Sequence, residues 1–190
     1  MQAQNIPPVG YKFIEYAETI GDARIILPFG FNPNDTVKAY AAVTDFRSDG
    51  FLISPLTWND ANNRFAMIGG YRDDFSVAFG SHNTVWYGHS APKDSQFHLW
   101  TYGARNFTLD GGETWDASAA TWGSDTTSLI LFYGYANNTA GKIAYYDHRK
   151  ADGTRYHIVP IQHKETGVVE MYDTVSKTIM QRTGTLYPPT

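Results

Sequence analysis

Three short polar segments combine a tryptophan with amide or carboxylate side chains: Trp58-Asn59-Asp60, Trp115-Asp116 and Trp122-Gly-Ser-Asp125. An indole ring can stack on the C–H face of a pyranose, while amides and carboxylates hydrogen-bond its hydroxyl groups. The candidate glycan-binding residues are therefore Trp58, Asn59, Asp60, Trp122, Trp115 and Asp116. Alternatively, these rings cap the ends of the fold or lie in a subunit interface. We favour a core or interface position for Trp86 and Trp100.

Other chemistry has little support in the sequence. The chain contains no Gly-x-Ser-x-Gly motif and no glycine-rich phosphate loop. Its six histidines are scattered, without the close spacing of a zinc site. The absence of cysteine excludes disulfides, thiolate ligands and a cysteine nucleophile. We therefore predict no catalytic residues and no enzymatic activity.

The composition is typical of one domain rich in strands. The chain has 190 residues, of which 42% are hydrophobic and 15% aromatic, and a net charge of −4. This charge argues against a nucleic-acid partner, because such proteins present a clustered basic surface. No apolar run approaches the roughly 18 residues of a membrane helix, so we expect no membrane insertion. The first 13 residues lack the basic start and apolar centre of a signal peptide.

Many short apolar runs separated by Gly-, Asn- and Asp-rich turns predict an all-β sandwich or barrel. The predicted strands are Tyr11–Ala17, Ala23–Phe29, Thr36–Val43, Gly50–Ser54, Arg64–Gly69, Phe75–Gly80, Thr84–Tyr87, Gln96–Tyr102, Phe107–Leu109, Ser128–Tyr133, Lys142–His148, Thr154–Pro160 and Val168–Tyr172. Some strands are apolar on both faces, with Phe97 and Leu99 on one side and Trp100 and Tyr102 on the other. Helical periodicity is scarce, and its best candidate is Met171–Met180.

Several of these segments form a recognisable series. They are Tyr11-Lys-Phe-Ile-Glu15, Thr108-Leu-Asp-Gly111, Gly141-Lys-Ile-Ala-Tyr-Tyr-Asp147, Tyr156-His-Ile-Val-Pro160 and Lys164-Glu-Thr-Gly167. In this series the chain resembles the concanavalin A-like, laminin G-type jelly roll found in phage structural proteins and gut bacterial surface proteins. The similarity extends over roughly residues 11–187 and is most specific in the C-terminal third. We expect Pro160 to end its strand, because proline cannot donate to a ladder.

The resemblance implies an all-β, two-sheet antiparallel jelly-roll sandwich, concanavalin A-like, that forms a single domain over residues 11–190. Residues 1–10 would form an N-terminal arm. Laminin G-type folds often bind calcium through loop oxygens, which makes Asp60, Asn62, Asp73 and Asp74 calcium candidates. Asn and Asp also occur in turns for backbone reasons alone, so beyond calcium we expect no metal and no cofactor.

Retaining glucanases of this architecture carry Glu-x-Asp-x-x-Glu on one strand. The nearest match here, Glu113-Thr-Trp-Asp116, lacks the third carboxylate. The resemblance thus implies a non-catalytic, lectin-like module on a virion or bacterial cell surface, such as a fibre or decoration protein. It would bind glycans, form homo-oligomers and dock through its arm on other virion or surface proteins. Two alternatives stay open: a purely structural assembly domain without glycan binding, and a diverged glycoside hydrolase.

Overall fold

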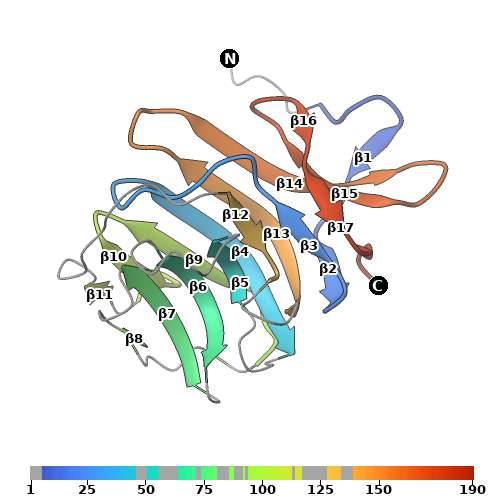
Figure 1. Ribbon diagram of the computed structural model, residues 1–190. Coiled ribbons are helices and arrows are strands. Elements are labelled where there is room, and N and C mark those ends of the chain that lie inside the picture. The colour runs from blue at the N-terminus through green and yellow to red at the C-terminus, as the bar shows by residue number, and fades with distance from the viewer. Residues whose placement is uncertain are drawn as a thin grey trace.

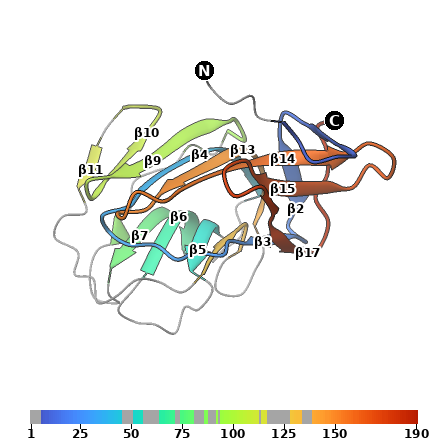
Figure 2. The ribbon, with the colours of Figure 1, turned by 90° about the horizontal axis from the view of Figure 1, so that it is seen from above.

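The protein is built from two antiparallel β-sheets that lie face to face (Figures 1 and 2). The computed structural model describes residues 6–45, 51–55, 64–71, 74–80, 86–87, 92, 94–112, 114–116, 128–133 and 139–190. All regular structure in these ranges is β-strand. No helix of a length and hydropathy suited to crossing a membrane occurs in them.

The larger sheet, sheet A, is centred on two ten-residue strands. Its path is β11 (Thr114–Asp116), β10 (Asn106–Leu109), β9 (His98–Gly103), β4 (Thr36–Asp45), β13 (Ala140–Arg149), β14 (Arg155–His163), β15 (Val169–Asp173) and β16 (Thr178–Ile179). Off this path, β1 (Tyr11–Phe13) pairs with β14 and β2 (Ala17–Ile20) pairs with β13. Strand β13 therefore pairs with β4 along one edge, whereas β2 and β14 share its other edge.

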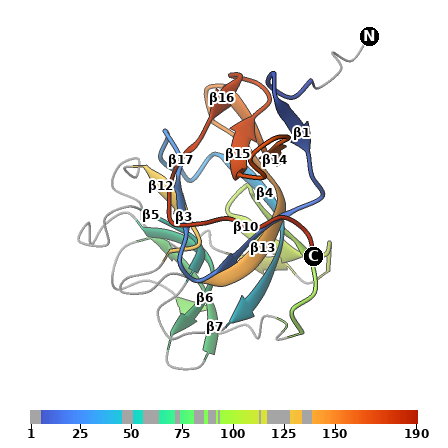
Figure 3. The same ribbon diagram turned by 90° about the vertical axis from the view of Figure 1, so that its right-hand side faces the viewer.

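Sheet B lies against the inner face of sheet A. Its path is β17 (Gln181–Thr183), β3 (Arg24–Ile26), β12 (Leu129–Leu131), β5 (Phe51–Pro55), β6 (Arg64–Tyr71), β7 (Asp74–Gly80) and β8 (Trp86–Tyr87). Figure 3 shows β17 beside β3 in this sheet and β1 beside β14 in the other. Segments from the two ends of the chain thus complete both sheets.

The core fills the space between the sheets. From sheet A it takes the inward side chains of Trp100, Tyr102 and Tyr146, and from sheet B those of Ile25 and Leu131. All five are at most 3% exposed. This is the period-2 alternation of strands with one face on the core. The predicted core position of Trp100 is confirmed, whereas for Trp86 only the backbone, in β8, is described.

The predicted all-β class and the two antiparallel sheets are confirmed. The helix considered at Met171–Met180 is wrong. Its first residues belong to β15 and its end to β16, with a turn between them. The carboxylate of Asp173 accepts hydrogen bonds from the backbone N–H groups of Val175 (3.1 Å) and Ser176 (3.0 Å). An aspartate that binds the following backbone in this way stabilises a turn rather than a helix.

The expected strand end at Pro160 is also wrong, because β14 continues through Pro160 to His163. On one edge of β14, the pairing with β13 reaches Ile158, and the pairing with β1 starts at Ile161. Pro160 falls where this neighbour changes, so its missing N–H interrupts no ladder bond with β13. Its carbonyl still accepts a hydrogen bond from Ile14 N at 3.3 Å.

The first predicted strand, Tyr11–Ala17, is two strands, β1 and β2, with a break over residues 14–16. Part of the expected N-terminal arm contacts the sheet. The carbonyl of Gly10 accepts a hydrogen bond from Lys164 N at 2.8 Å, while Val9 is fully exposed. Residues 1–5 lie outside the described ranges.

Candidate functional site

The outer face of sheet A carries an unusual number of rings. On β4 the inward residues Ala39 and Ala41 are fully buried, which turns Tyr40 outward with 38% of its surface exposed. On β13, Tyr146 is fully buried and its neighbour Tyr145 points outward. The pairing of β4 with β13 sets Tyr40 directly opposite Tyr145. The site is therefore made by register between strands distant in sequence.

Four rings follow one another across the strands β9, β4, β13 and β14. The order is Phe97, just before β9, then Tyr40, Tyr145 and His157, and we call this set the aromatic row. Successive ring centroids lie 5.2, 6.0 and 6.2 Å apart. Successive ring planes are inclined by 35°, 30° and 35°, so no ring stands edge-on to the next. Because neighbouring strands in a sheet are twisted relative to one another, a row that crosses them turns gradually.

Tyr16 extends the row at the Phe97 end, with ring centroids 5.4 Å apart. The ammonium group of Lys142 lies 5.0 Å from the Tyr16 ring centroid and 4.0 Å from the Glu18 carboxylate. Cations over ring faces are attracted by the negative face of the π-system. This end of the row is therefore bordered by charged groups that already have partners.

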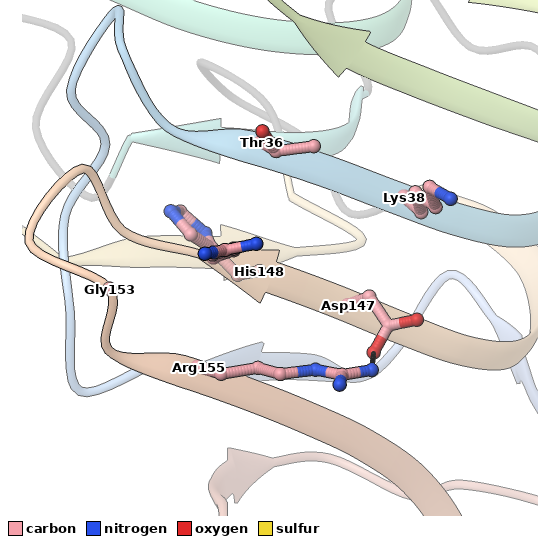
Figure 4. Close-up of a pocket in the computed structure, with 7 residues that line it drawn as sticks. Thr36, Lys38, Asp147, His148, Gly153 and Arg155 are labelled. Atoms are coloured by element: carbon pink, nitrogen blue, oxygen red, sulfur yellow. Dashed lines mark ion pairs between the residues drawn. The ribbon is translucent and has the colours of Figure 1, made fainter.

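At the other end, the outer face of sheet A is hollowed into a pocket of about 400 Å³ (Figure 4). It is lined by Thr36 and Lys38 of β4, Asp147, His148 and Arg149 of β13, Gly153 of the following turn, and Arg155 of β14. Lys38 and Asp147 are each two residues from a tyrosine of the row, on the same face of their strands. The pocket therefore lies next to the row on the same face of sheet A.

Asp147 is the central acceptor of this pocket. Its Oδ1 lies 2.6 Å from Nδ1 of His157 and 3.7 Å from the guanidinium of Arg155. Figure 4 shows Arg155 extending along β14 toward the carboxylate. The Asp147 charge, together with burial, raises the pKa of the Tyr145 hydroxyl; burial is the larger cause. Asp147 of the pocket and His157 of the aromatic row therefore meet where the pocket and the row adjoin.

A buried polar network lies beneath the pocket and fixes its floor. Asp35 and His148 have fully buried side chains, and Nε2 of His148 lies 2.8 Å from the Asp35 carboxylate. The other ring nitrogen, Nδ1, is 2.8 Å from the Tyr146 hydroxyl. The ammonium group of Lys150 lies 3.2 Å from Asp35, which also accepts from the backbone N–H of Ala151 at 2.8 Å. The β13–β14 turn is thereby tied to the segment before β4.

One protonation state satisfies every group in this network. A neutral His148 donates from Nε2 to Asp35 and accepts at Nδ1 from the Tyr146 hydroxyl. Burial lowers the pKa of His148, against the opposing effect of Asp35. Burial alone would raise the pKa of Asp35, but its hydrogen bonds from His148, Asn32 and Ala151 outweigh that effect and lower it. We therefore assign a neutral imidazole beside an ionised carboxylate.

A second histidine cluster lies at the start of β9, directly after Phe97 in the sequence. His98 is held between two carboxylates, with Nδ1 2.6 Å from Asp110 and Nε2 3.0 Å from Asp94. Burial works against the charged ring, but the hydrogen bonds to Asp110 and Asp94 prevail and raise the pKa of His98. Both carboxylates are thereby committed to an ion pair. This arrangement leaves neither of them poised for acid–base work.

Most of the glycan-binding candidates named from the sequence fall outside the part of the chain that the structure describes, so they stay a prediction. Trp58, Asn59, Asp60 and Trp122 lie outside the described residues. Trp115 and Asp116 belong to β11, the edge strand of sheet A, where Asp116 is exposed and only the backbone of Trp115 is described.

The calcium candidates Asp60, Asn62 and Asp73 also lie outside the described residues. Asp74 is the first residue of β7, and its side chain is not described. Among the residues that the structure describes, no group of three His, Asp or Glu side chains is arranged to hold a metal ion.

Sequence reasoning missed the aromatic row. The signal was present in part, since Phe97 and Leu99 were correctly assigned to the face opposite Trp100 and Tyr102, which are buried. The outward direction of Tyr40 could have been inferred from the small apolar residues on either side of it, Ala39 and Ala41, which fit an inward face.

No family model matches this chain, and a search of curated proteins finds no match. The function is therefore inferred from the geometry of sheet A.

Proposed function

We propose that this chain is a non-catalytic, lectin-like module that binds glycans on the outer face of sheet A. The proposal includes a concanavalin A-like jelly-roll topology, homo-oligomeric assembly, and display on a virion or bacterial cell surface as a fibre or decoration protein. The topology, setting and assembly come from the sequence resemblance. The binding face comes from the aromatic row.

The row itself carries the proposal. Sugar rings bind proteins by stacking their C–H faces on aromatic planes while polar side chains bind their hydroxyls. Tyr40 and Tyr145 offer adjacent, similarly inclined rings 6.0 Å apart, a spacing comparable to the span of a pyranose. Asp147 and His157 border them with hydrogen-bonding groups, and the pocket of about 400 Å³ falls in the range of small-ligand sites.

Two other functions compete with this one. An assembly domain would bury the aromatic row against another protein, since aromatic side chains are enriched in interface cores. A diverged glycosidase would need two free carboxylates facing each other across a cleft. In the described part of the chain, the carboxylates of Asp94 and Asp110 lie on either side of one ring, and both bind His98.

A glycan-array screen with and without calcium tests the proposal, followed by calorimetry on the hits. We expect Tyr40→Ala and Tyr145→Ala to weaken binding roughly tenfold, because each removes one stacking plane. The matched control is Tyr187→Ala, a tyrosine outside the row that is 37% exposed against 38% for Tyr40. Trp58→Ala and Trp122→Ala test the loop tryptophans in the same screen.

The outcomes separate the three functions. Binding that depends on Tyr40 and Tyr145 supports a glycan-binding face. A folded, oligomeric protein that binds no glycan, with the row protected from solvent in the oligomer, would favour the assembly domain. Release of reducing ends from a bound glycan would favour the hydrolase.

A further inference from the structure

We propose that the pocket next to the aromatic row takes the anionic group of an acidic saccharide. This inference rests on the proposed glycan-binding function and names the class of glycan. The stacking rings of the row accept any pyranose, so they do not choose between neutral and charged sugars. The charges that line the pocket make that choice.

The pocket concentrates positive charge in a protein whose net charge is −4. Three of its lining residues are cationic, Lys38, Arg149 and Arg155, and one is anionic, Asp147. Within the described structure, neither Lys38 nor Arg149 has an ion-pair partner. Arg155 is 64% exposed and lies at a loose 3.7 Å from Asp147. Lys38 and Arg149 are thus available to a ligand, and Arg155 is held only by this long ion pair.

Asp147 does not cancel this field. Its Oδ1 is already engaged, since it lies 2.6 Å from Nδ1 of His157 and 3.7 Å from the Arg155 guanidinium, and this one carboxylate faces three cationic side chains in the pocket. Its other oxygen remains an acceptor for a sugar hydroxyl. A sugar that carries both hydroxyls and an anionic group suits this mixture, because the hydroxyls donate to Asp147 and the anion accepts from the cations.

The geometry ties the charged pocket to the stacking rings. Lys38 is paired with Asp147 across β4 and β13, and the next outward pair on the same two strands is Tyr40 with Tyr145. The other neighbour of Asp147, across β13 and β14, is His157, the last ring of the row. A sugar stacked on Tyr145 therefore places its substituents beside Lys38 and Asp147. The buried Asp35–His148 pair links β13 to the segment before β4 beneath the pocket. The backbone that carries Lys38 and Arg149 is therefore held in place.

The test compares acidic saccharides with their own uncharged forms. The panel is oligogalacturonate, hyaluronan and polysialic acid, each beside its carboxyl-reduced counterpart, and carboxyl-reduced chondroitin sulfate beside its desulfated form. The carboxylate and sulfate arms distinguish the two sources of negative charge. Affinities are measured by calorimetry at low and high salt. We expect at least one acidic member to bind roughly tenfold tighter than its uncharged form, with the difference shrinking at high salt.

The variants locate the preference. Lys38→Ala and Arg149→Ala should weaken binding of the acidic form roughly three- to tenfold and leave the uncharged form unchanged. Both side chains are exposed, so neither change disturbs the core. Lys12→Ala, an exposed lysine on β1, is the matched control and should change nothing.

Each other outcome overturns the inference in a recognisable way. Equal affinity for charged and uncharged forms, with both lost in Tyr40→Ala, would refute the acidic preference and leave the glycan-binding function standing. An acidic preference that survives Lys38→Ala and Arg149→Ala would place the charge recognition elsewhere. Absence of binding to every saccharide of the panel and of the array would refute both proposals.

Discussion

Replacing Asp35 by asparagine should destabilise the protein strongly without changing its shape. The carboxylate accepts hydrogen bonds from Asn32 N (2.9 Å), Ala151 N (2.8 Å) and His148 Nε2 (2.8 Å), and the Lys150 ammonium lies 3.2 Å away. Every neighbour is a donor. The asparagine side chain has only one oxygen that can accept hydrogen bonds. Its NH2 group would take the place of the other carboxylate oxygen and would face N–H donors that it cannot accept from.

The magnitude follows from the groups left without an acceptor. With the amide oxygen kept on Ala151, the NH2 group replaces the oxygen that serves Asn32, His148 and Lys150. A buried donor without its acceptor costs about 1–3 kcal/mol. Lys150 is partly exposed and keeps the Gly30 carbonyl at 3.0 Å, so it adds little. The free energy of unfolding should fall by about 3 kcal/mol, in line with the cost of breaking a buried pair.

Urea unfolding at neutral pH, followed by tryptophan fluorescence, measures this loss. For a slope of about 2 kcal/mol per molar urea, the midpoint should fall by about 1.5 M. The control is Asp152→Asn in the same β13–β14 turn, whose exposed carboxylate accepts from Thr154 N at 2.8 Å. It should lower the midpoint by well under half as much. Equal midpoints for the two variants would refute the assignment of Asp35 as the acceptor that holds the network together.

The same network predicts how stability depends on pH. The pKa of His148 is lowered in the folded state, so the unfolded chain binds this proton first and stability falls as pH drops below the ordinary histidine pKa. The pKa of Asp35 is lowered as well, so its contribution is present above the ordinary aspartate pKa and is lost on further acidification. Asp35→Asn should therefore flatten the profile below the ordinary aspartate pKa but not in the histidine range, because the Asp35 carboxylate raises the pKa of His148 and its loss lowers that pKa further. Urea unfolding at a series of pH values measures both parts of the profile.

Two further changes test other parts of the fold. The pKa of His98 is raised, so its pairs with Asp94 and Asp110 stabilise the protein below the ordinary histidine pKa, and this stabilisation is lost as pH rises. His98→Gln should therefore lower Tm more at about pH 5.5 than at about pH 8.5. An equal loss of Tm at both pH values would contradict this. Gly184→Ala should cost about 3 kcal/mol in urea unfolding, because φ is +73° and a Cβ would overlap the Asp22 carbonyl. Gly153→Ala, with φ of +92° in open space, should cost about 1 kcal/mol, and similar losses for the two variants would refute the overlap.

The strands were largely predictable from sequence, because a two-residue period records which face is buried. The expected Thr36–Val43 and Lys142–His148 fall within β4 and β13. The prediction at Pro160 was wrong because it used only the missing N–H of proline. Whether that N–H is needed depends on which strand lies beside the residue, and the local sequence does not give this. The change of neighbour from β13 to β1 depends on pairing between distant segments.

The candidate site was less predictable for a related reason. Tyr40 meets Tyr145 only through the register of β4 on β13, and that register shifts at a bulge between Ile143 and Tyr145. A shift of one residue moves every side chain to the opposite face. Residue types could indicate stacking chemistry, but only the pairing could bring Phe97, Tyr40 and Tyr145 into one row.

The pairing scheme has a consequence for how the chain folds during synthesis. Every described partner of β1, β2, β3 and β4 comes from β9 or later: β14 for β1, β13 for β2, β12 and β17 for β3, and β9 and β13 for β4. Among the described strands, β4 thus has no partner until β9 has left the ribosome, and β1, β2 and β3 have none until β12 or later strands follow. The β13–β14–β15 meander forms from local contacts and can template the early strands. Such late, long-range closure predicts slow folding, with strand edges unpaired and open to aggregation until β13 is made.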